Sequence, residues 1–208
     1  PMGLGLARWP GAQHGSSVRA MAEAGVLRDG LVAAHLVHVN ADDAALLARH
    51  GVRAAHCPVS NATLRCGRSP VEALRGAGVP VALGTDSPGS AGAYDVRAEA
   101  RACLATHAAA GIHHTPRQLL AMCTLDAARV IGRDDVGALV PGMRADLVAI
   151  RPPPEALPGD PHAAALDALA RVEHVWVDGE PLLRDGRPLR VDAAEIETRA
   201  GSRRRVVC

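Results

Sequence analysis

The chain lacks several features that would assign it to particular classes of protein. No apolar run approaches the ~20 residues that a membrane-spanning helix needs. The first ten residues, PMGLGLARWP, lack a charged region followed by an apolar core, so they do not predict a signal peptide. Neither sign of charge dominates: the formal net charge is +1, which gives no electrostatic basis for binding nucleic acid or an anionic membrane.

The chain has few cysteines, and their spacing shows no paired motif. The five cysteines are odd in number and scattered, and no two of them form a Cys-x-x-Cys pair. This spacing argues against a disulfide framework and against a zinc knuckle. It predicts a reducing compartment, and we expect the cytoplasm.

What is present is an alternation of strand-like and helix-like segments. Short apolar runs alternate with segments that carry helix caps, such as Asn40 followed by two aspartates and later by Gly51. The run at 31–39 is continuous enough to predict a strand buried on both faces. This order predicts parallel βαβ units, hence an α/β fold. The predicted strands are 31–39, 52–59 and 79–86, and the predicted helices are 14–25, 40–51, 69–78 and 94–110.

The pattern changes beyond these units. Two more helices are expected, one from Thr115, where Gln118 completes a capping box, and one capped by Thr124. The segment 137–150 then predicts two extended runs around a Pro-Gly turn. A second hairpin with an Asp178-Gly179 turn follows a proline-rich, mobile stretch. The last dozen residues predict a frayed tail with a solvated arginine run.

Polar residues stand near the ends of the three predicted strands. His35, His56 and Asp86 follow one another in this way, and the carboxyl ends of parallel strands meet at one edge of a sheet. Two imidazoles and a carboxylate suit a divalent metal that activates water. Alternatives stay open: Asp86 could cap the next helix, and His38, on the same face as His35, could be the inward residue. The histidines on or beside the 94–110 helix are expected to be solvent-exposed: His107, His113 and His114.

Four segments in sequence order resemble a known family. AAHLVHV, AHCPVSN, GVPVALGTDS and GALVPGMRADLVAI look like signatures of the amidohydrolase superfamily, nearest to its cytosolic aminohydrolases. That group includes methylthioadenosine/S-adenosylhomocysteine deaminases, aminodeoxyfutalosine deaminases and triazine chlorohydrolases. The resemblance, from about residue 14 to about 187, implies a distorted (β/α)8 barrel with a composite β-sandwich. It also implies one catalytic metal, zinc or alternatively iron.

The resemblance implies a role for each matching residue. Asp86 matches the aspartate after the eighth barrel strand, which binds the metal and accepts a proton from the attacking water. His35 matches the histidine after the sixth strand, which stabilises charge on the substrate and in some members touches the metal. The remaining matches are expected to shape the substrate pocket: His56, Ser60, Asn61 and Ser87.

Two motifs of the family are missing from the chain. The His-x-His of the first barrel strand and the His-x-x-Glu after the fifth strand do not occur in the required places. A complete barrel takes about 250 residues, so the resemblance implies strands six to eight only. We therefore expect a C-terminal half: partial barrel at 1–136, β-sandwich appendage at 137–190, tail at 191–208. Alone it should be inactive, bind metal weakly and aggregate unless another chain completes it.

The expected activity is metal-dependent hydrolysis of a C–N bond. The resemblance favours deamination of an adenine-type or related N-heterocycle. No nucleic-acid or membrane partner is expected. Many members of such families form homo-oligomers, so a homo-oligomer is one expected assembly. Chlorohydrolase or guanine deaminase activity is the alternative within the superfamily. A non-catalytic truncated remnant is the alternative outside enzymes. A flavodoxin-like module is disfavoured because the chain has no Gly-rich phosphate loop.

Overall fold

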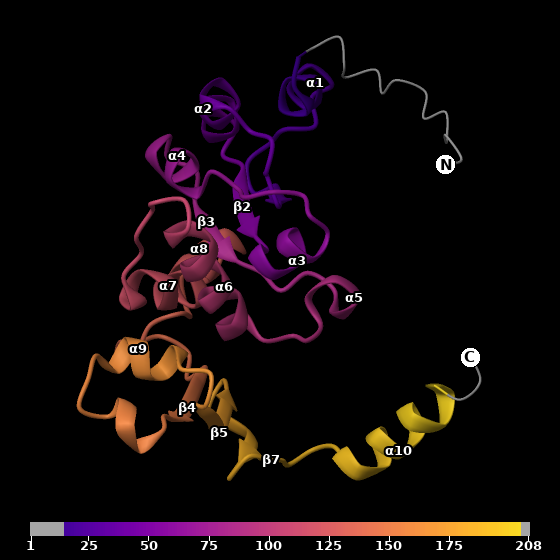
Figure 1. The fold of residues 1–208 in the computed structure, drawn as a ribbon, viewed down its shortest axis with the longest axis vertical. Helices are drawn as coiled ribbons and strands as arrows, with labels where there is room; N and C mark the ends of the chain where they lie inside the picture. Colours follow the sequence, from indigo (N-terminus) through magenta and orange to yellow (C-terminus); the bar gives the residue numbers. More distant parts are fainter. Residues whose placement is uncertain (1–14, 205–208) are drawn as a thin grey trace. The chain divides into compact units, whose positions relative to one another are not determined.

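The structure is a computed structural model that describes residues 15–204. Its chain divides into two compact units, residues 1–134 and 135–208. Figure 1 traces the elements of both units along the chain.

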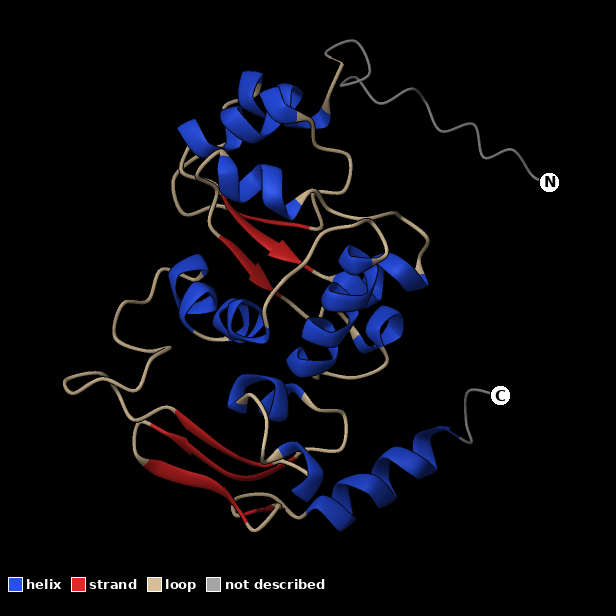
Figure 2. Cartoon of the chain, turned by 60° about the vertical axis from the view of Figure 1, so that its left-hand side comes forward, coloured by secondary structure: helices blue, strands red, loops and turns tan. Residues whose placement is uncertain are grey.

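The first unit is built on a three-stranded parallel sheet. Its strands β1 (Val32–Ala34), β2 (Arg53–His56) and β3 (Val81–Leu83) lie in the order β1-β2-β3. Ala33 pairs with Ala54 and Ala55 with Ala82, so all three strands run the same way and their carboxyl ends share one edge (Figure 2). The predicted βαβ order is therefore confirmed.

Eight helices of the first unit surround this sheet within the described residues. Pro58 begins a short helix, α3, that the sequence did not predict, because the strand before it was expected simply to stop there. Helices α6, α7 and α8 contact β3. The bounds are α1 Ser17–Glu23, α2 Ala41–Arg49, α3 Pro58–Thr63, α4 Val71–Gly76, α5 Pro88–Ala91, α6 Val96–Ala108, α7 Pro116–Cys123 and α8 Leu125–Val130.

Most of the predicted caps are present. Asn40 and Asp43 form a reciprocal capping box at α2, and Thr115 and Gln118 form another at α7. The cap at Thr124 is wrong. Its hydroxyl donates to the carbonyl oxygen of Leu120, one turn back in α7, and so does not cap α8.

The strands differ in burial. β3 is buried at all three positions, as expected of a strand covered on both faces. The same expectation for residues 31–39 is wrong: β1 has three residues, of which Val32 is 42% exposed. Within the described residues β1 pairs only with β2, so its other edge has no strand to cover it. His35 and Leu36 then take positive φ angles of 67° and 46°, which end the strand early.

The second unit contains one antiparallel sheet. The described residues form a four-stranded sheet in the order β4-β5-β6-β7, and the predicted β-sandwich stays a prediction. The Asp178-Gly179 hairpin is confirmed, since both residues have positive φ as a tight turn requires. The strands are β4 Leu147–Arg151, β5 Arg171–Val177, β6 Glu180–Arg184 and β7 Arg187–Pro188.

Two expectations for this unit need correction. Residues 137–140 form no strand, so the Pro-Gly turn is followed by one extended run, β4, and preceded by none. The proline-rich stretch contains a short 3-10 helix, η2 (Pro154–Ala156), and α9 (Pro161–Leu166), and its mobility stays a prediction. The tail forms α10 (Ala193–Arg204) where a frayed segment was expected. The side chains of the arginine run lie outside the described residues.

No helix among the described residues combines the length and the apolar character needed to cross a membrane.

Candidate functional site

Asp86 lies beyond the carboxyl end of β3, at the edge where all three parallel strands end. Its φ is 55°, a left-handed conformation that non-glycine residues rarely adopt. The Ser60 hydroxyl donates to Asp86 Oδ2 at 2.6 Å, and Ser90 Oγ lies 3.1 Å from the same oxygen. Strained backbone at a strand end is typical of functional positions. Asp86 is thus held in place by two hydroxyl groups, with 33% of its side chain exposed.

His35 faces Asp86 from the end of β1. Its Nδ1 lies 2.8 Å from Asn61 Oδ1, which can only accept, so this nitrogen carries a proton in that contact. The tautomer with its proton on Nδ1 leaves Nε2 as the nitrogen that can bind a cation. That nitrogen lies 3.8 Å from Asp86 Oδ2. A basic nitrogen and a carboxylate oxygen are therefore directed toward one another across the sheet edge.

The short helix α3 supplies both groups that hold this pair. Ser60 and Asn61 are consecutive, buried residues of α3, at 0% and 2% exposure. The first turn of α3 is fixed by Glu99 of α6, whose Oε2 accepts from the Val59 backbone N–H at 2.9 Å. Ser60 therefore reaches Asp86 while Asn61 reaches His35. Three segments far apart in sequence converge here.

The hydrogen bonds around Asp86 favour its charged form. The Ser60 hydroxyl, and after it that of Ser90, lower the pKa of Asp86 below the ordinary value for aspartate. At neutral pH the side chain is then a carboxylate. Such a group can coordinate a cation or accept a proton.

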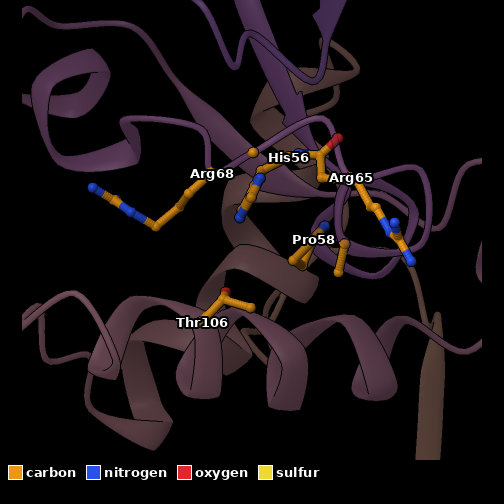
Figure 3. Close-up of a pocket in the computed structure, with 8 residues that line it drawn as sticks. His56, Pro58, Arg65, Arg68 and Thr106 are labelled. Carbon is orange, nitrogen blue, oxygen red and sulfur yellow. The ribbon is translucent and has the colours of Figure 1, made fainter.

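His56 lies apart from this pair. It is 2% exposed, and neither ring nitrogen has a hydrogen-bond partner among the described residues. Burial lowers its pKa to about 3, so the ring is neutral at physiological pH. Its ring borders a pocket of about 300 Å³ between α3 and α6, drawn in Figure 3 with Arg68 and Thr106. Asn61 lines the same pocket.

Ser87 is exposed and follows Asp86 directly. Its hydroxyl lies 3.5 Å from Ser90 Oγ, and its backbone carbonyl accepts from the Ser90 backbone N–H at 3.1 Å. His38 is exposed. The structure brings His35, rather than His38, to within 3.8 Å of the Asp86 carboxylate.

A second group of titratable side chains was not predicted. His107 is fully buried and His114 is 10% exposed, so the expectation that both face solvent is wrong; the same expectation for His113 is confirmed. Both buried histidines meet Glu72 of α4. The spacing of Ala100, Cys103 and His107 along α6 follows one buried face, a signal that could have revealed His107.

The edge at Asp86 offers two side chains that suit a metal ion, fewer than a complete site needs. An aspartate oxygen and a histidine nitrogen are ordinary zinc ligands, and both side chains are partly exposed on the same side, at 33% and 37%. Catalytic zinc sites use three protein ligands. The pair therefore fits one part of such a site.

Comparison with known proteins places this geometry in a family. Residues 10–182 match the Amidohydrolase family. A 5-methylthioadenosine/S-adenosylhomocysteine deaminase of Desulfitobacterium hafniense (strain DSM 10664 / DCB-2) is 36% identical over 199 residues, covering 90% of this chain and 46% of that protein. The deaminase of the same name from Moorella thermoacetica is 37% identical over 196 residues, 89% of this chain and 45% of that protein.

Solved structures show the same fold. An adenosine deaminase from Xanthomonas campestris with bound zinc has a TM-score of 0.83 at 30% identity, covering 93% of this chain and 46% of that one. Atrazine chlorohydrolase TrzN from Arthrobacter aurescens TC1, complexed with zinc, has a TM-score of 0.81 at 24% identity over 92% of this chain and 45% of that one. At that identity the second likeness shows the fold alone.

The chain spans about half the length of the curated relatives that it matches. The fold likenesses identify the first unit as part of a TIM-barrel-type hydrolase fold, as the sequence predicted. The family match covers most of the chain, and several relatives exceed 30% identity over nine-tenths of it. The chain belongs to the amidohydrolase family.

Proposed function

We propose that this chain supplies the Asp86 side of the active site of a hydrolytic deaminase acting on an adenine-type N-heterocycle. The observation that carries the proposal is the convergence of Asp86, His35 and α3 at one sheet edge, with Asp86 held as a carboxylate. The relatives named as deaminases and the zinc-containing adenosine deaminase support the same reaction class.

Each residue has a defined part in this proposal. Asp86 would hold a divalent metal, zinc by preference and iron as the alternative, with His35 as the candidate second ligand and further ligands from outside the described residues. When bound, the metal supplies Lewis-acid polarisation of water. Asp86 accepts the proton that the water gives up and passes it toward the leaving amino group, while the Ser60 hydroxyl keeps its Oδ2 oriented.

His35 and the pocket residues act on the substrate. Asn61 fixes the ring of His35 so that Nε2 faces the reacting centre. There Nε2 would bind the metal when unprotonated, or would donate to charge that develops on the substrate when protonated. Ser60, Asn61, Ser87 and His56 are proposed to shape the substrate pocket; His56 and Asn61 line the cavity beside α3. With only two metal ligands proposed from this chain, the 208-residue polypeptide alone is expected to be inactive and to bind the catalytic metal weakly.

Several further expectations belong to the same proposal. The proposed substrate is a small N-heterocycle, and no nucleic-acid or membrane partner is proposed. The protein is proposed to act in the cytoplasm and to form a homo-oligomer. The domain bounds 1–136, 137–190 and 191–208 are proposed for the partial barrel, the β-sandwich appendage and the tail. Size-exclusion chromatography with light scattering measures the oligomeric state.

The substrate class can be tested by identifying the leaving group. The zinc-loaded native polypeptide that carries this chain is incubated separately with S-adenosylhomocysteine, 5-methylthioadenosine, adenosine and atrazine. We expect ammonia release from at least one adenine compound and no chloride from atrazine. Chloride release without ammonia would replace the deaminase proposal by the chlorohydrolase alternative.

The Ser60 hydroxyl gives a prediction about pH dependence. Because its hydrogen bond lowers the pKa of Asp86, Ser60→Ala should raise that pKa and move the acid limb of kcat/KM to higher pH. We expect kcat at neutral pH to fall by about tenfold, the loss of roughly one hydrogen bond to a charged group.

The control is Thr124→Val, which also removes a hydroxyl, here one bonded to a backbone carbonyl in α7. It should leave the acid limb in place. A Ser60→Ala profile that superposes on the wild-type profile would show that Ser60 does not hold the catalytic carboxylate.

A further inference from the structure

We propose that Glu72, His107 and His114 form a second divalent metal site, for zinc or an ion of similar preference, separate from the Asp86 edge. The inference goes beyond the proposed function and does not depend on it. The three residues come from α4, from the last turn of α6 and from the segment before α7.

The three candidate ligand atoms form a small triangle. His107 Nδ1 lies 3.0 Å from Glu72 Oε1 and 2.9 Å from His114 Nε2, and His114 Nε2 lies 3.3 Å from Glu72 Oε1. Zinc binds nitrogen and oxygen at about 2.0–2.2 Å, which puts two tetrahedral ligands about 3.3–3.5 Å apart. An ion about 1 Å above the triangle would reach all three atoms after shifts of a few tenths of an ångström.

Hydrogen bonds among neutral rings satisfy at most two of the three contacts of this triangle at once. If His107 Nδ1 donates to Glu72, then His114 Nε2 can donate to Glu72 only by placing its proton against that of His107 Nδ1. If His114 donates to His107 instead, the lone pair of Glu72 faces His107 without a proton between them. A neutral imidazole has one proton for its two nitrogens. A cation between the three atoms satisfies all three contacts.

The surroundings suit an ion that enters from solvent and stays. Glu72 is 39% exposed in its side chain, whereas His107 is fully buried and His114 is 10% exposed. The second oxygen of Glu72 accepts from Arg68 at 3.2 Å, which fixes the carboxylate with Oε1 toward the histidines. A bound ion would connect α4 to the end of α6 and the start of α7. A structural role follows from that position.

A neighbouring group shares His107 and is a weaker candidate. Ligand atoms of His56, Cys103 and His107 lie within 4.8 Å of one another, and all three residues are buried. That group has no carboxylate, and all three of its residues are buried, so it offers neither a fixed negative charge nor an exposed ligand. The Glu72 group has closer atoms, a negative charge and an opening to solvent.

The test measures zinc bound per chain by equilibrium dialysis and elemental analysis, using metal-free protein. Glu72→Gln and His114→Asn should each weaken binding at this site by at least about 100-fold, since even the partners of ligands contribute 10- to 100-fold. His113→Asn removes the adjacent exposed histidine and should leave binding unchanged. Asp86→Asn separates the two sites, because it should affect only the metal at the sheet edge.

Zinc X-ray absorption on the Asp86→Asn variant keeps the proposal falsifiable if a cluster variant fails to fold. We expect a shell of nitrogen and oxygen at about 2.0–2.2 Å and no sulfur. A zinc–sulfur distance of about 2.3 Å would assign the ion to the Cys103 group and overturn the proposal. Zinc binding that is absent from the Asp86→Asn variant, or equal in wild type and both cluster variants, would overturn it as well.

Discussion

Asp86→Asn is expected to lower kcat for ammonia release by about 10³-fold or more, near the upper range for a lost general base. The amide keeps the size of the side chain and an oxygen that accepts from Ser60, so the fold around it should persist. It cannot accept a proton, and it is a poorer ligand for a cation than a carboxylate. Steady-state ammonia release at saturating zinc and substrate, together with zinc content, measures both losses.

Asp126→Asn is the matched control for this substitution. Asp126 lies in α8, 15% exposed in its side chain, and pairs with Arg75 and Arg129, which are 42% and 63% exposed. It should retain wild-type kcat. If Asp86→Asn and Asp126→Asn were equally active, Asp86 would have no part in proton transfer, and the proposed mechanism would be wrong.

The buried ring of His56 should make the protein less stable in mild acid. In the folded state its pKa is about 3, below the ordinary histidine value of 6.5, because burial disfavours the charged ring. The unfolded chain therefore binds a proton below pH 6.5 that the folded chain does not bind. The stabilisation is present above pH 6.5 and is lost as the pH falls, by about 2 kcal/mol between pH 7 and pH 5.

Urea unfolding with a chelator present measures this effect at both pH values. Burial also lowers the pKa of His107, so this ring adds to the loss of folding stability as the pH falls. His56→Gln removes the titrating ring and should reduce the pH dependence by about 2 kcal/mol. His38→Gln, at an exposed position, should not change it. An unchanged pH dependence in His56→Gln would show that this ring does not stay neutral in the folded protein.

The local features of the fold could be predicted because they depend on neighbouring residues. The capping boxes of α2 and α7 need only residues three positions apart, and both are present. The order of strands and helices follows from the alternation of apolar runs with capped segments. The burial of β1 could not be predicted in this way, because it depends on what pairs with its outer edge.

Features that depend on contacts distant in sequence were the ones missed. His114 reaches His107 and Glu72 only after α4 and α6 have packed, and 42 positions separate Glu72 from His114. Proline at 58 indicated the end of a strand, yet it equally suits the first turn of a helix, and the buried Glu99 of α6 stabilises that choice. The positive φ angles of His35 and Asp86 could not be predicted, because neither residue is a glycine.

The candidate site was accessible from sequence only in part. His35 and Asp86 could be named because parallel strands bring their carboxyl ends together, and the structure places their side chains 3.8 Å apart. Ser60 contacts Asp86 and Asn61 contacts His35 because both residues lie on α3. The sequence did not predict that helix, so these two contacts could not be predicted. The assignment of catalytic and substrate-binding roles to these residues remains a proposal.

The central claim is that this chain carries one side of a metal site whose other ligands come from elsewhere. Sequencing the reading frame upstream of the codon for Pro1 tests it most directly. We predict an open frame that encodes a His-x-His and, further along, a His-x-x-Glu. An in-frame stop codon with neither motif before it would contradict the claim and favour a non-catalytic member of the family.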